Sequence, residues 1–65
     1  MITLTRLNGR PFVLNAEHIR TVEEKPDTVI TLTTGEHILV REDMRDVIDR
    51  AVEYGRTLRR LVPPS

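Results

Sequence analysis

Residues 28–40, which read TVITLTTGEHILV, decide the fold because they join two alternating strand patterns through a glycine turn. β-Branched residues interleaved with polar ones are typical of half-buried strands. A three-residue loop over 33–35, with its glycine in the left-handed conformation, pairs Ile30 with Ile38 and Thr28 with Val40. A two-residue loop would scatter apolar side chains over both faces, which the side-chain period of two makes costly. The stretch therefore predicts an antiparallel hairpin with one apolar face.

The same pattern of alternating residues around a glycine turn occurs at the start of the chain, where residues 2–15 read ITLTRLNGRPFVLN. A three-residue loop over 7–9 places Leu4 opposite Phe12 and Ile2 opposite Leu14. A two-residue turn inside that loop stays open as the alternative, and it would make the hairpin apolar on both sides. Between the two hairpins, Ile19 and Val22 stand three apart, so they share a face only with a bulge or a short turn. Strands are expected over 2–7, 10–15, 18–24, 28–33 and 36–41.

From Glu42 onward the apolar period changes to that of a helix, and it continues to residue 62. Asp43 is the expected N-cap, and two prolines at 63 and 64 end the helix. Residues 42–53 carry five acids and two arginines, a net charge of −3, whereas residues 54–65 carry three arginines and no acid, a net charge of +3. That polarity complements the helix dipole. The predicted fold is α+β, mainly β: a small antiparallel sheet of about five strands in two or more hairpins, then one C-terminal amphipathic helix over 43–62 and a short tail over 63–65, all in one domain.

Composition excludes several classes of protein. The 65 residues contain no cysteine, and ten Lys and Arg balance ten Asp and Glu. Zero net charge makes a nucleic acid an unlikely partner. No apolar run approaches the roughly 18 residues of a membrane span, so we expect no direct membrane insertion. The first residues lack the layout of a signal peptide, which favours a cytoplasmic location.

The residues that carry enzyme chemistry are nearly absent. There is no cysteine, and the only serine is Ser65, so a nucleophilic triad of the usual type has no nucleophile. His18 and His37 lack a second ligand at metal-binding spacing, and positions on the surface of strands explain them better. We therefore predict a protein that is not an enzyme, with no catalytic, cofactor or metal site.

The predicted helix is longer than the sheet that must cover it. At 1.5 Å per residue it spans about 30 Å, whereas strands of six residues span about 20 Å. Either the helix packs diagonally, or its last two turns bury against another chain. A small core without disulfides favours the second alternative, a homo-oligomer. The stripe also fits a heptad, with residues 44, 51 and 58 at one position and 47, 54 and 61 at another. The predicted interface comprises Ala51, Gly55, Leu58, Leu61 and Val62.

Two stretches of this sequence are similar to a known family. The opening ITLTRLNG with FVLN at 12–15, and the central PDTVITLT at 26–33 with the glycine at 35, resemble the small flagellar FlbD/SwrD family. The similarity covers about residues 2–58. It implies a cytoplasmic accessory protein for motility or swarming, which supports the power of the flagellar motor at the level of the stator, at the inner membrane. The family brings no catalytic or cofactor residue to this chain.

A partner surface is expected on exposed loops or at the basic end of the helix. Its candidate residues are Asn8, Gly9 and Arg10 in the first loop and Arg56, Arg59 and Arg60 near the tail, and the candidate partners are flagellar motor or stator components. An alternative from a different class is a small RNA- or regulator-binding β module that controls flagellar gene expression. It would use the same arginine cluster with Tyr54 nearby, although two aromatic residues in the whole chain make a poor stacking platform.

Overall fold

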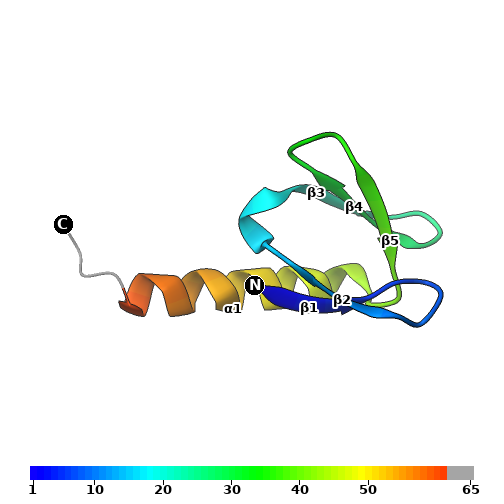
Figure 1. Ribbon diagram of the computed structural model, residues 1–65. Coiled ribbons are helices and arrows are strands. Elements are labelled where there is room, and N and C mark those ends of the chain that lie inside the picture. Colours follow the sequence, from blue (N-terminus) through cyan, green and yellow to red (C-terminus); the bar gives the residue numbers. More distant parts are fainter. Residues whose placement is uncertain (62–65) are drawn as a thin grey trace.

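Five strands precede one long helix in the part of the chain that the structure, a computed structural model, describes (Figure 1). The backbone is described for residues 1–61 and the side chains for residues 1–58. The predicted α+β class, mainly β, is confirmed. The elements, in order, are β1 (Ile2–Thr5), β2 (Pro11–Leu14), a 3-10 turn η1 (Ala16–His18), β3 (Ile19–Glu24), β4 (Thr28–Leu32), β5 (His37–Val40) and α1 (Met44–Leu61).

Both hairpins have the predicted register. In the first, β1 pairs antiparallel with β2, with Leu4 opposite Phe12 and Ile2 opposite Leu14. In the second, β4 pairs with β5, and Ile30 lies opposite Ile38. The glycines at 9 and 35 have φ of +91° and +93°, the left-handed conformation that a three-residue loop requires. The two-residue alternative for the first loop is therefore wrong.

The five strands are divided between two small sheets instead of forming one. One sheet has the order β1-β2 and the other β3-β4-β5. A single bridge between Arg6 and Val40 joins them, together with a 2.8 Å hydrogen bond from the Arg41 N–H to the Thr5 carbonyl. Beyond this point the Thr5 N–H donates to the side chain of Glu42 and not to a strand. The ladder stops there because a side chain has taken the place of the next backbone acceptor.

The middle strand carries the irregularity that its apolar spacing requires. The register between β3 and β4 shifts between Ile19 and Thr21, so Ile19 and Val22 both pack against the core. The preceding turn η1 begins at Asn15, whose side-chain oxygen accepts a 3.1 Å hydrogen bond from the Glu17 N–H. A short turn and a bulge therefore occur together.

The core lies between the two sheets and the first half of the helix. Its buried apolar side chains come from four of the strands and from α1: Ile2, Leu4, Leu14, Ile30, Val40 and Val47. Four of them have less than 2% of their surface exposed. Phe12 and Tyr54 pack at the margin of this cluster. A core of this size fits a 65-residue chain, which buries only about 60% of the surface of its unfolded state.

The start of the helix follows the sequence prediction. The Asp43 side chain accepts a 2.8 Å hydrogen bond from the Asp46 N–H, as an N-cap does. A second carboxylate, that of Glu24 at the end of β3, accepts from the Met44 N–H at 3.1 Å. Two of the free N–H groups at the start of α1 are therefore paired with acidic side chains, which the helix dipole also favours.

The helix extends well past the strands. Its 18 residues span about 27 Å at 1.5 Å per residue, and the molecule measures 41 × 22 × 18 Å. Figure 1 shows the strands gathered over the N-terminal half of α1, while its C-terminal half projects beyond them. The two sheets thus cover only part of the apolar stripe.

Candidate functional site

The two histidines are exposed, and the Glu24 carboxylate makes structural hydrogen bonds. His37 is exposed on β5, with its Nδ1 2.9 Å from the hydroxyl of Thr31 on the neighbouring strand. His18 is exposed at the end of η1. Glu24 binds the start of the helix and the Thr28 hydroxyl. Within the residues that the structure describes, no group of three acidic or histidine side chains is placed to hold a metal ion.

The first hairpin loop is exposed but tightly bonded. The Arg6 N–H donates to the Arg10 carbonyl and the Gly9 N–H to the Arg6 carbonyl, both at 2.9 Å. The Asn8 side chain closes the loop by accepting from the Arg10 N–H at 2.9 Å. Leu7, at the loop's first position, is 41% exposed. An apolar side chain on a rigid, solvent-exposed turn is a suitable contact for a protein partner.

Arg41 holds this loop from the other sheet. Its Nε donates a 3.0 Å hydrogen bond to the Leu7 carbonyl. Its guanidinium nitrogen also lies 3.5 Å from where a Cβ on Gly9 would stand. We call the residues 7–10 together with Arg41 the first-hairpin surface. A hollow of about 270 Å³ opens beside it, with Leu7 and Arg41 in its lining and Glu24, Asp27 and Asp43 among the other residues.

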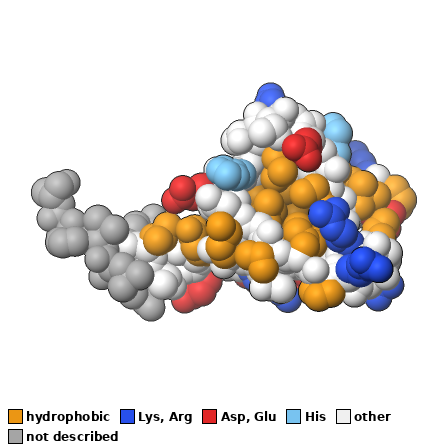
Figure 2. Space-filling model, viewed as in Figure 1, with side chains coloured by type: hydrophobic (Ala, Val, Ile, Leu, Met, Phe, Trp, Pro, Cys, Tyr) orange, Lys and Arg blue, Asp and Glu red, His pale blue; other side chains and the backbone are white. Residues whose placement is uncertain are grey.

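Arginines make the edge of the first-hairpin surface basic. Arg6 lies over the ring of Phe12, with its guanidinium carbon 4.6 Å from the ring centroid. Arg6 and Arg10 occupy opposite ends of the loop and are both exposed. Figure 2 shows Lys and Arg side chains around the hairpin end of the molecule, next to hydrophobic side chains that lie over the strands.

Glu42 ties the helix start to β1. Its carboxylate accepts from the Thr5 N–H and from the Thr5 hydroxyl, each at 2.8 Å, and lies 3.9 Å from Arg50. Burial raises the pKa of this carboxyl, but hydrogen bonds from the two backbone N–H groups of Thr5 and Glu42, the Thr5 hydroxyl and the Arg50 charge together lower the pKa below its ordinary value. Glu42 is therefore a structural carboxylate and not a proton donor at neutral pH.

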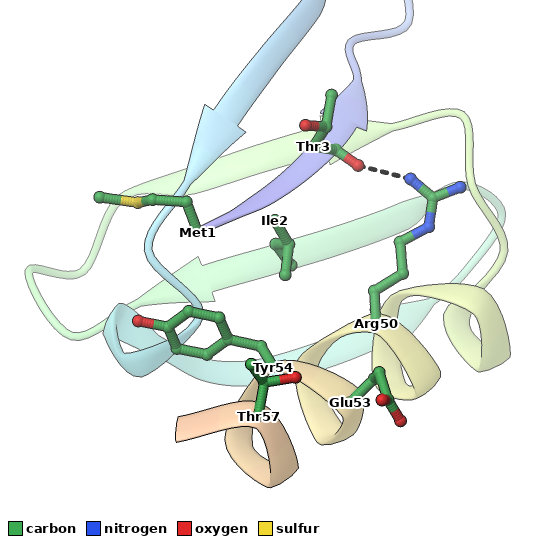
Figure 3. Close-up of a pocket in the computed structure, with 7 residues that line it drawn as sticks. All are labelled: Met1, Ile2, Thr3, Arg50, Glu53, Tyr54 and Thr57. Atoms are coloured by element: carbon green, nitrogen blue, oxygen red, sulfur yellow. Dashed lines mark hydrogen bonds between the residues drawn. The ribbon is translucent and has the colours of Figure 1, made fainter. Parts of the chain in front are cut away.

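A second hollow, of about 440 Å³, lies between β1 and α1. Figure 3 shows the Arg50 guanidinium at one side of it, donating to the Thr3 carbonyl, and the Tyr54 ring at another. The complete lining is Met1, Ile2, Thr3, Arg50, Glu53, Tyr54 and Thr57. Arg50 is held in place by Asp46, at 3.1 and 3.2 Å, so this wall of the hollow is preformed.

The structure separates the two heptad positions of the helix. Val47 is fully buried and Tyr54 packs on the core, so that position faces the strands. The other heptad position holds Met44, Ala51 and Leu58. Ile48 and Gly55 lie four residues after Met44 and Ala51, so all five form a separate line beside Val47 and Tyr54. We call this line the helix seam; its described residues are Met44, Ile48, Ala51, Gly55 and Leu58. Three of these belong to the predicted interface, whereas Leu61 and Val62 lie outside the residues whose side chains are described.

The predicted arginine cluster is described only at its first member. Arg56 is exposed and pairs with Glu53 at 3.7 Å. Arg59 and Arg60 lie outside the described side chains. Figure 1 places the C-terminal half of the helix and the first hairpin at opposite ends of the molecule. The two halves of the predicted partner surface are therefore separate surfaces.

Sequence reasoning missed the residues that organise these surfaces. Arg41, Glu42 and Arg50 each bind a segment more than 30 residues away. The only signal for Arg41 and Glu42 is a run of charges at the border between strand and helix, which is equally typical of a solvated turn. Arg50, inside α1, has no such signal. The packing of the helix against β1 had to be known before their partners could be named.

Comparison with known proteins gives a family match over most of the chain. The model of the FlbD family, flagellar and swarming motility proteins, matches residues 1–58. No curated protein and no solved structure matches the chain. No helix in the described part is long and apolar enough to span a bilayer. The matched residues contain both hairpins, the first-hairpin surface and the helix as far as Leu58. The chain belongs to the FlbD family of flagellar and swarming motility proteins.

Proposed function

We propose that the chain is a cytoplasmic accessory protein without enzymatic activity, which supports flagellar motility or swarming by contacting motor components at the level of the stator. The observation that carries the proposal is the family match over residues 1–58, which supplies the link to flagellar and swarming motility. The described residues add surfaces suited to protein contacts and no arrangement suited to metal chemistry. The stator is a more specific assignment than flagellar motility, and it rests on the family resemblance.

The first-hairpin surface is the part of the molecule best suited to the motor contact. Its loop is held by three internal hydrogen bonds and by Arg41, so little conformational entropy is lost on binding. Leu7 offers an apolar centre, and Arg10 offers a charge at the edge. Charges at the edge of an interface mainly set the association rate and the choice of partner. We therefore propose a partner segment that presents an apolar side chain next to an acidic one.

Crosslinking in living cells tests this contact. A photo-reactive amino acid at position 10 is expected to capture a stator component, whereas the same group at Glu23, exposed on β3, is expected to capture none. Capture of the same component from both positions, or of none from position 10, would remove the first hairpin as the contact.

Motor output tests the role. In cells without the chromosomal copy, the Arg10→Glu variant is expected to restore swarming and the torque of single motors less well than the wild type. The matched variant Arg20→Glu, also exposed, is expected to restore both. Equal restoration by the two variants, at equal protein levels, would contradict the proposed surface. Wild-type torque in cells that lack the protein altogether would contradict the stator role.

The RNA-binding alternative gains no support from the described residues. Tyr54 is half-buried against the core, and Arg56 is paired with Glu53. Phe12, the other aromatic residue, lies beneath Arg6. Exposed rings on which bases could stack are what that function would need.

A further inference from the structure

The helix seam has large apolar side chains that are only partly covered in a single copy. Met44 is 36% exposed and Ile48 38% exposed, and Val52, beside the seam, is 45% exposed. They stand at spacings of four, so they form one ridge along the helix. The opposite side of the stripe, at Val47, is already fully covered by the strands. The seam is thus a second apolar line on the helix, beside the buried one.

The centre of the seam is made of small residues. Ala51 and Gly55 lie between Ile48 and Leu58, and no atom of the described chain outside this helix lies within 4 Å of where a Cβ on Gly55 would stand. Small side chains let two helix backbones approach closely, at the lower end of the usual 8–10 Å between axes. The larger side chains of Ile48 and Leu58 would then contact the second helix on either side of this centre.

Charge determines how a second helix would lie. Residues 42–53 have a net charge of −3 and residues 54–65 one of +3. A parallel pair would place each half against its own kind, whereas an antiparallel pair places each half against the opposite charge.

We infer that two copies of this chain pair through the helix seam, with their α1 helices antiparallel about a two-fold axis that passes midway between Ala51 and Gly55. In this arrangement Ile48 lies opposite Leu58 of the second copy, and Ala51 lies opposite its Gly55. Every contact occurs twice, as two-fold symmetry requires. The described seam residues that face one another run from residue 48 to residue 58, about 15 Å, a small interface that makes pairing dependent on concentration. The pairing leaves both first-hairpin surfaces free and does not depend on the motor contact.

Sedimentation equilibrium tests the pairing over a concentration range from about 1 µM to about 1 mM. The expected mass rises from the 7.5 kDa of one chain toward twice that value. A mass of 7.5 kDa throughout the range would overturn the inference and leave the seam to a different protein.

Two substitutions on the seam test the surface itself. Gly55→Leu has room in a single copy but blocks the close approach, so it should abolish pairing and leave the circular dichroism spectrum unchanged. Ile48→Asp, at a position that is 38% exposed, should also abolish pairing. Two matched controls are expected to pair as the wild type does: Gly55→Ala, whose methyl group equals that of Ala51, and Val13→Asp, 63% exposed on β2. A dimer that survives both seam substitutions would overturn the proposed interface.

Disulfide trapping tests the orientation, and the absence of native cysteine makes it clean. When the Ile48→Cys and Leu58→Cys variants are mixed and oxidised, the mixed disulfide is expected to form fastest. In a dimer of either variant alone, the cysteine of one copy lies about 15 Å from that of the other along the antiparallel pair. Each variant alone should therefore crosslink slowly. Fast crosslinking of each variant alone would overturn the antiparallel arrangement.

Discussion

The Glu42 carboxylate accepts two hydrogen bonds from Thr5, one from its backbone N–H and one from its hydroxyl, each 2.8 Å long. The two residues are 37 positions apart in the chain. The Thr5 N–H, at the end of β1, has no neighbouring strand among the described elements to accept its hydrogen bond, and Glu42 immediately precedes the helix N-cap. The pair therefore replaces a sheet contact with a side-chain contact, and it joins the first hairpin to the helix.

Removing the carboxylate should destabilise the fold. In Glu42→Ala the Thr5 N–H and hydroxyl lose their acceptor in a partly buried place, which costs about 1–3 kcal/mol. The free energy of unfolding in urea measures the loss. Glu23→Ala, at an exposed position on β3, is the control and should change stability by less than about 0.5 kcal/mol. Equal losses of unfolding free energy in the two variants would show that the contact with Thr5 does not stabilise the fold.

The same carboxylate should make stability depend on pH. Because the folded pKa of Glu42 lies below its ordinary value near 4.5, the ionised group contributes fully above that value. The contribution disappears as the pH falls through the folded pKa. The difference in unfolding free energy between the wild type and Glu42→Gln is therefore expected to stay constant from pH 7 to about pH 5 and to shrink below it. A difference that grows toward acid pH would contradict the lowered pKa.

The helix N-cap should show the usual cost of its removal. Asp43→Ala leaves the Asp46 N–H without its 2.8 Å acceptor, and the expected loss is about 1 kcal/mol. Thermal unfolding followed by circular dichroism measures the loss. The control is Asp49→Ala, which removes the same charge farther along the helix, where no free N–H needs an acceptor. A loss in the control as large as that in Asp43→Ala would assign the effect to charge alone.

Arg41 should govern the mobility of the first loop more than the stability of the whole molecule. Arg41→Met keeps the aliphatic length but removes the 3.0 Å bond to the Leu7 carbonyl. Amide hydrogen exchange in the loop should then accelerate, with a global loss of only about 1 kcal/mol. The matched variant Arg20→Met, at an exposed position on β3, should leave exchange at Gly9 unchanged. Unchanged exchange in Arg41→Met would show that the internal bonds of the loop suffice.

Local rules of the chain predicted much of this fold. Period two and the glycines at 9 and 35 determined both hairpin registers, and the spacing of Ile19 and Val22 required a bulge or a short turn. Asp43 as the helix cap follows from an acid placed before a periodic apolar run. These features depend on residues close together in sequence, so a single chain suffices to predict them.

The division into two sheets could not be predicted in the same way. It depends on Glu42 reaching Thr5, and a lone glutamate before a helix carries no sign of a partner 37 residues away. The helix stripe posed a similar problem. Its sequence shows ten apolar or small positions, but only the arrangement of the strands reveals that Val47 is fully buried and Tyr54 packs on the core, whereas Met44 and Ile48 stay partly exposed.

Three consecutive side chains, at positions 41, 42 and 43, reach in turn to the first loop, to β1 and to the start of the helix. No glycine or unbonded residue separates these attachments. A displacement of the loop is consequently passed to the helix without a hinge to absorb it. The first loop and the start of the helix are therefore attached to each other through one short segment of three residues.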